Sequence, residues 1–185
     1  MGCIFNPHVL HQIARAHLEL PHQEMVCGIA RELARAYPGH LETREEWMLS
    51  LAGGAMGIMT VLHGSLSEYV LIFGTPIGTE GFSGRYHIGI FDFLLAGEMW
   101  TYTEDAFRTA TISRPGDMAY LGPGQAKGFR LKAGTWMLEY GRGPVVTALP
   151  FALGDALLAF DGPTIARTLK VYGRLVLREL RQGKV

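Results

Sequence analysis

The spacing of apolar residues divides the chain into a helical beginning, a long middle of short runs, and a helical end. From Asn6 or Pro7 to Leu20, and again from His22 to Tyr37, apolar residues recur at helix-like intervals, and Pro38-Gly39 ends the second segment. The next hundred residues contain short apolar runs separated by glycine and proline turns. This rhythm predicts an antiparallel sandwich or barrel, and Gly53-Gly54 predicts a tight hairpin turn within it.

The periodicity lengthens again after Arg142-Gly143-Pro144. Residues 147–182 predict two helices, and Pro163 opens the second. Its basic residues form one stripe (Arg167, Lys170, Arg174, Arg178 and Arg181), and an apolar stripe lies opposite (Ile165, Leu169, Tyr172 and Val176). This pattern is typical of a helix lying on an anionic membrane surface, and also of the solvated face of a packed helix.

Composition favours one globular domain. Of 185 residues, 48% are hydrophobic and 18% are charged, and the 17 basic side chains balance the 17 acidic ones. A chain without excess positive charge is not expected to bind nucleic acid. We predict a single domain over 1–185, with N-terminal helices in 1–40, a β-barrel in 45–144 and C-terminal helices in 147–182. The most apolar stretch, Trp47–Leu62, is shorter than the roughly 20 residues that span a bilayer, so no transmembrane helix is predicted.

Two carboxylates are the most informative candidates for chemistry. The histidines either precede the strands or stand alone, so no metal site is predicted. Asp92 and Glu139, in contrast, are each the only charged residue of an otherwise apolar strand. Burying an ionised carboxylate is costly unless it is paired or neutralised. If both point into one barrel, they share a proton or hold a ligand cation; alternatively, each side chain faces solvent or caps a turn.

Three segments carry a family resemblance that extends over nearly the whole chain. They are GSLSEYVLIFGT at 64–75, GFSGRY at 81–86 and WMLEYGRG at 136–143. In these motifs and their order the chain resembles the sigma non-opioid receptor and the fungal sterol delta-8 to delta-7 isomerases. The resemblance implies a mainly β fold with flanking α: a cupin-like antiparallel β-barrel without metal or cofactor, N-terminal helices, and two C-terminal helices covering the barrel mouth.

The resemblance also implies partners and a location. The C-terminal helices are expected to rest on a membrane surface, which would place the protein peripherally on a cytoplasmic or endoplasmic-reticulum-like membrane face. A homotrimer is expected as well. The ligand implied is a sterol or an amphiphilic amine, held in the barrel cavity.

Residues that match the family's motifs are the expected site. In the receptor, the acid matching Glu139 pairs with the basic amine of ligands, and the acid matching Asp92 hydrogen-bonds to it; both are the catalytic candidates here. Tyr69 matches the tyrosine that supports this glutamate. The remaining expected ligand-binding residues match cavity positions: Phe73, Met59, Leu71, Tyr86, Leu149, Ala152 and Tyr172.

Two functions from different classes follow from the resemblance. The first is a cofactor-independent sterol isomerase that shifts a ring double bond from delta-8 to delta-7 by carboxylate acid/base chemistry. The second is a non-catalytic, sigma-receptor-like ligand-binding protein. Family members place a further acid where this chain has Gly89 and Ile90, which favours the second. Ala55, Leu131 and Leu121 also depart from the receptor's pattern.

Overall fold

Helices flank a β-rich centre on both sides. The computed structural model describes residues 2–184, so 1 and 185, the two ends of the predicted domain, lie outside it. The helices are α1 (Pro7–Ala16), α2 (His22–Ala36), α3 (Leu149–Leu158) and α4 (Gly162–Arg181), and a 3-10 turn, Val145–Ala148, precedes α3. Between the two helix pairs lie the strands β1 (Met48–Ala52), β2 (Ala55–Gly64), β3 (Glu68–Thr75), β4 (Thr79–Phe82), β5 (Gly89–Ala96), β6 (Met99–Thr103), β7 (Ala106–Ser113), β8 (Met118–Leu121), β9 (Gly128–Leu131) and β10 (Thr135–Arg142).

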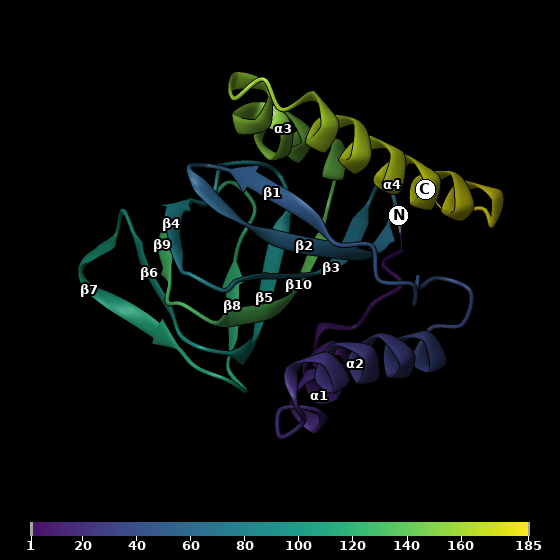
Figure 1. Ribbon diagram of the computed structural model, residues 1–185, viewed down its shortest axis with the longest axis horizontal. Coiled ribbons are helices and arrows are strands. Elements are labelled where there is room, and N and C mark those ends of the chain that lie inside the picture. Colours follow the sequence, from purple (N-terminus) through teal and green to yellow (C-terminus); the bar gives the residue numbers. More distant parts are fainter. Residues whose placement is uncertain (1, 185) are drawn as a thin grey trace.

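The strands form two antiparallel sheets (Figure 1). One has the order β1-β2-β3-β10-β5-β8 and the other the order β4-β9-β6-β7. From β3 onward the chain crosses repeatedly between the sheets, which places strands far apart in sequence side by side. The expected mainly β architecture of antiparallel strands with flanking helices is therefore confirmed. Of the two expected forms, sandwich or barrel, the strands form a sandwich, because in the described residues no ladder joins an edge strand of one sheet to the other sheet.

Local sequence explains where the first elements begin and end. The side chain of Asn6 accepts a hydrogen bond from the backbone of His8 at 2.9 Å, which caps α1, and Pro7 fits its first turn. The helix expected to reach Leu20 ends at Ala16, because His17 caps it: the backbone N–H of His17 donates to the oxygen of Ala14, and its ring Nδ1 lies 2.9 Å from the oxygen of Ile13. The Gly53-Gly54 hairpin is confirmed, with both residues at positive φ between Ala52 and Ala55.

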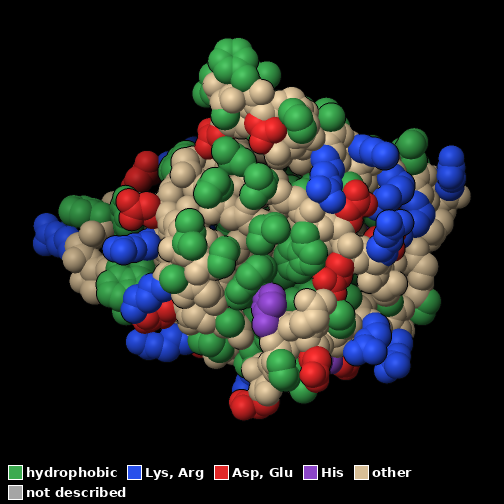
Figure 2. Space-filling view, viewed as in Figure 1, with side chains coloured by type: hydrophobic (Ala, Val, Ile, Leu, Met, Phe, Trp, Pro, Cys, Tyr) green, Lys and Arg blue, Asp and Glu red, His purple; other side chains and the backbone are tan. Residues whose placement is uncertain are grey.

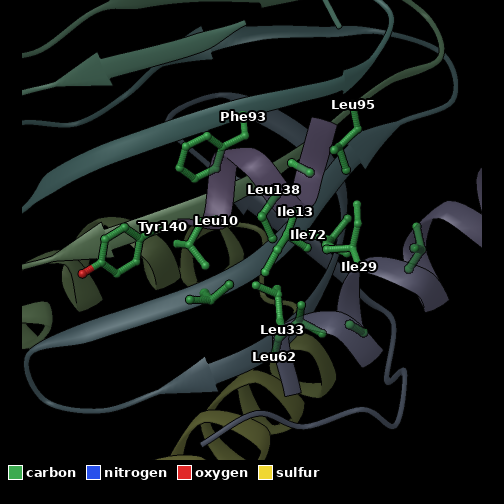
Figure 3. Packing of buried hydrophobic residues seen from close by; sticks show 14 of the residues in the cluster. Leu10, Ile13, Ile29, Leu33, Leu62, Ile72, Phe93, Leu95, Leu138 and Tyr140 are labelled. Carbon is green, nitrogen blue, oxygen red and sulfur yellow. The ribbon is translucent and has the colours of Figure 1, made fainter. Parts of the chain in front are cut away.

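The N-terminal helices cover the outer face of the six-stranded sheet. Leu10 and Ile13 of α1 and Ile29 and Leu33 of α2 are buried against that face (Figure 3). Alternate residues of the strands pack against these helices, such as Ile72 of β3, Phe93 of β5 and Leu138 of β10. Because side chains alternate along a strand, the strand residues between those that pack against α1 and α2 point to the opposite side of the sheet, into the sandwich.

The C-terminal helices lie on the other side of the molecule, over the end of the sandwich at β1 and β2 (Figure 1). Val171 and Leu175 of α4 pack against Met48 and Val61 of these strands. The expectation that two C-terminal helices cover the mouth of the β structure is confirmed. Within residues 2–184, no helix combines the length and the hydropathy that crossing a membrane requires.

Candidate functional site

A largely apolar cavity of about 220 Å³ lies between the two sheets, beneath α3 and α4. Both sheets, both C-terminal helices and the segment before α3 contribute to its wall. All ten residues expected from the family resemblance lie on this wall: Asp92, Glu139, Tyr69, Phe73, Met59, Leu71, Tyr86, Leu149, Ala152 and Tyr172. The structure therefore brings the candidate residues together, and their roles in binding or catalysis stay predictions.

Strand alternation turns both carboxylates into this cavity. On β10, Leu138 and Tyr140 face the N-terminal helices, so Glu139 between them faces inward with Met137. Glu139 stands directly opposite Asp92 of β5 in the antiparallel ladder. Opposed residues on one face of a sheet have Cβ atoms about 5 Å apart, so the two carboxyl groups are immediate neighbours.

Tyr69 of β3 anchors Glu139 from the other neighbouring strand. Its hydroxyl donates a hydrogen bond to Oε1 of Glu139 at 2.6 Å. The ring lies over Gly141, where an added Cβ would be only 2.2 Å from a ring carbon of Tyr69. A residue without a side chain is therefore required at position 141 for the tyrosine to reach the carboxyl group.

The same cavity wall holds a lysine that sequence analysis did not identify. Nζ of Lys127 lies 2.5 Å from Oδ2 of Asp92, and the two side chains are only 11% and 5% exposed. Lys127 directly precedes β9, just after a glycine-rich turn, a position at which a lysine is ordinarily solvated. The sequence carried no signal for its inward orientation, because that depends on how β9 pairs in the second sheet.

The electrostatics of the site follow from burial and from these three charges. Burial raises the pKa of Glu139 to about 7, and the neighbouring charge of Asp92 acts in the same direction. The hydrogen bond from Tyr69 and the charge of Lys127 oppose this rise. Burial and the nearby Glu139 also raise the pKa of the Tyr69 hydroxyl well above its ordinary value, so it stays a hydrogen-bond donor at neutral pH.

Departures from the family pattern fall at two kinds of position. Ala55 and Leu131 line the cavity, so their small or aliphatic side chains shape the pocket directly. Leu121 instead packs with Ile88 and Ile90 beside the cavity. Sequence analysis also did not select several wall residues from helices and strands, namely Phe129, Phe151, Leu153 and Thr168.

The basic stripe of α4 is only partly directed away from the protein. Arg174 lies 3.3 Å from a carboxylate oxygen of Glu46, and Arg178 donates to the backbone oxygen of His40 at 2.7 Å. Figure 2 shows this mixture of basic and acidic side chains over α4. The buried face of α4 contains Val171, Leu175 and Glu179, whereas Tyr172 of the expected apolar stripe lines the cavity. The buried face of α4 therefore differs from the predicted apolar stripe, because one part of the helix surface packs on the strands and another part covers the cavity.

In the part of the chain that the structure describes, no group of three or more His, Cys, Asp or Glu side chains is close enough to hold a metal ion. The charged side chains that line the cavity within that part are Asp92, Glu139 and Lys127.

Comparison with known proteins assigns a family. The model of the "ERG2 and Sigma1 receptor like protein" family matches residues 1–184. The chain is 42% identical over 178 residues to the sigma non-opioid intracellular receptor 1 of Gallus gallus, covering 95% of this chain and 80% of the relative. It is 38% identical over 158 residues to a protein erg2 homolog of Dictyostelium discoideum, covering 85% of this chain and 67% of the relative.

Among solved structures, an RmlC-like cupin from Shewanella frigidimarina has a TM-score of 0.45 at 15% identity, covering 54% of this chain and 85% of the cupin. The family assignment rests on the sequence matches, which extend over the strands and helices that build the cavity. This chain belongs to the ERG2 and sigma-1 receptor family.

Proposed function

We propose that the protein binds a sterol-like or amine-bearing amphiphile in the cavity between its sheets. The observation that carries this proposal is the pair of facing carboxyl groups, Glu139 and Asp92, in a largely apolar wall. Such a wall removes the hydrocarbon part of a ligand from water, and the few polar groups fix its head. The relatives named as receptors support a binding role.

Glu139 is the group best placed to meet the head of the ligand. Tyr69 holds its carboxyl group in one orientation through the 2.6 Å hydrogen bond. With a pKa of about 7, Glu139 can pair with an ammonium group as a carboxylate, or donate a hydrogen bond to a hydroxyl group as an acid. Aromatic rings of Tyr69, Phe73 and Tyr86 lie on the same wall and favour a cation near their faces.

Calorimetric titration with dodecylamine tests the binding role. Glu139→Gln is expected to weaken amine binding at least roughly tenfold, because it removes the carboxylate and keeps the size of the side chain. Glu104→Gln is the matched control, since the Glu104 side chain is 79% exposed, pairs with Arg85 and does not line the cavity. Equal affinities of the wild type and Glu139→Gln would reject the proposed role of this carboxylate.

A second candidate function is isomerisation of a sterol double bond. It is favoured by the contrast between the two carboxyl groups: Glu139 has a pKa near neutrality, whereas Asp92 is ion-paired with Lys127. Neighbouring groups that differ in this way are suited to act as acid and base in one reaction. A relative named as an erg2 homolog is consistent with this alternative.

The proposed reaction needs only these side chains. Glu139 donates its proton to one carbon of the double bond, and the other carbon becomes a carbocation. A carboxylate, assigned here to Asp92, takes a proton from the carbon beside the cation, and the electrons of that C–H bond form the shifted double bond. The negative charge left on Glu139 and the ring of Tyr69 stabilise the cation while it exists.

Incubation with a delta-8 sterol in heavy water distinguishes catalysis from binding. A delta-7 product that carries deuterium, made by the wild type and absent with Glu139→Gln or Asp92→Asn, would establish the isomerase. No conversion by a wild type that still binds dodecylamine would reject catalysis and leave the binding role.

The location and assembly implied by the family stay part of this proposal. Leu157 and Leu158 at the end of α3 and Phe160 in the turn after it are 67%, 79% and 94% exposed, which suits contact with a lipid surface. Exposed Lys170 and Arg181 on α4 would add attraction to anionic headgroups. Flotation with anionic vesicles tests this contact, and sedimentation equilibrium tests the expected homotrimer.

A further inference from the structure

Lys127 enters the cavity from the position directly before β9, where its backbone is hydrogen-bonded. Its backbone nitrogen donates to Oγ of Ser83 at 2.9 Å, and its carbonyl oxygen accepts from the backbone nitrogen of Ser83 at 3.0 Å. Ser83 itself lines the cavity, next to the end of β4. The backbone of Lys127 is therefore held at both its N–H and its carbonyl group, and its ammonium group reaches Asp92 at 2.5 Å.

The ammonium group changes the charge available to a ligand. Without Lys127, two facing carboxyl groups would form the polar part of the wall, and both would attract a cation. With Lys127, Asp92 already has a positive partner inside the cavity, and only Glu139 is open to one from a ligand. Where Glu139 carries a proton, the charges of the three side chains sum to zero.

An uncharged cavity selects its ligand by hydrogen bonding and not by charge. A hydroxyl group can accept from the protonated Glu139 or from the ammonium group of Lys127 and donate to a carboxylate oxygen. An ammonium group on the ligand must instead first displace the proton of Glu139, and it approaches an ammonium group already present. Like charges in a site of low polarity repel strongly.

We propose that Lys127 sets the charge preference of the cavity. It forms an ion pair with Asp92, so this carboxylate is not available to a ligand cation, and the site selects uncharged, hydroxyl-bearing amphiphiles over amines. This inference rests on the proposed binding function and narrows its ligand class.

Titration of the wild type and of Lys127→Met with dodecanol and dodecylamine at pH 7 tests the inference. Methionine keeps an unbranched apolar stem of similar length and removes the charge. The wild type should bind dodecanol at least as tightly as dodecylamine. In Lys127→Met the ratio of amine to alcohol affinity should rise by roughly tenfold or more, because Asp92 is then open to the ligand's cation.

Three further variants keep the test independent of folding defects. Lys127→Arg retains the charge and should retain the wild-type ratio. In the double variant Asp92→Asn with Lys127→Met, both partners of the ion pair lose their charge, so the gain in amine affinity should disappear. Lys132→Met is the matched surface control, since the Lys132 side chain is 52% exposed and pairs with Glu98.

The outcomes separate this inference from the proposed function. An unchanged ratio in Lys127→Met, with both probes still bound, overturns the role of Lys127 and leaves the binding function intact. A gain that persists in the double variant also overturns it. Failure of the wild type to bind either probe overturns the proposed function, and the inference with it.

Discussion

Replacing Glu139 with glutamine should stabilise the folded protein in a pH-dependent manner. Burial raises the pKa of Glu139 from 4.5 to about 7, so its charged form is disfavoured in the folded state. Below pH 4.5 both the folded and the unfolded protein carry the proton, and this carboxyl group costs nothing. As the pH rises from 4.5 to 7, the unfolded chain ionises first, so stability is progressively lost.

The expected magnitude follows from the same two values. A pKa difference of that size corresponds to roughly 3 kcal/mol above pH 7, at about 1.4 kcal/mol for each pH unit. Glutamine has no proton to lose, and its amide oxygen still accepts the hydrogen bond from Tyr69. The stability gain of Glu139→Gln should therefore grow from near zero at pH 4.5 to about 3 kcal/mol at pH 8.

Urea unfolding of both proteins at a series of pH values measures this gain. Glu104→Gln, which removes an exposed carboxylate, corrects for the general effect of one negative charge. A stability difference between the wild type and Glu139→Gln that stays constant from pH 4.5 to 8 would refute the assignment of a buried, proton-carrying carboxyl group.

Other contacts lead to further expectations. Tyr69→Phe should raise the pKa of Glu139 by about one further unit, since it removes a charge-assisted hydrogen bond of about 1.5–3 kcal/mol; carboxyl carbon chemical shifts across a pH titration measure it, and an unchanged midpoint would contradict the role of Tyr69. Glu68→Ala should destabilise the fold by about 3–5 kcal/mol, because Glu68 is fully buried and ion-paired; chemical denaturation measures the loss, and less than about 1 kcal/mol would contradict it. Lys170→Glu combined with Arg181→Glu should weaken binding to anionic vesicles by roughly tenfold or more, at about 1 kcal/mol for each basic side chain removed; undiminished flotation would count against membrane contact.

The two carboxylates of the candidate site could be predicted from the sequence because charged residues are rare within apolar strands. A charged residue that interrupts an apolar strand must be paired, neutralised or exposed, so the sequence pattern alone identifies Asp92 and Glu139 as candidates. The pattern alone left open whether they face solvent or a cavity. Pairing of β10 between β3 and β5 decided this, because that register sets the two carboxyl groups directly opposite each other.

Local features were determined by the sequence itself. The glycine pair at 53–54 permits the positive φ angles of the first hairpin, and Asn6-Pro7 begins the first helix. These features depend on neighbours in the chain, so a reader of the sequence can find them. The end of α1 differs from its expected position at Leu20, because His17 caps the helix and the apolar pattern of the sequence does not show this cap.

Long-range contacts were decided only by the tertiary structure. Lys127 and Asp92 are 35 positions apart in the sequence, and Arg178 meets the backbone of His40 across 138. Each basic residue belongs to a stretch that reads as solvated, and each is drawn inward by an acceptor on another element. The sequence by itself determined where the helical and β regions lie, where the first hairpin turns and which two carboxylates need a partner, because those are properties of neighbouring positions. The pairing of distant strands decides that Asp92 forms an ion pair with Lys127, and this ion pair determines the charge of the cavity.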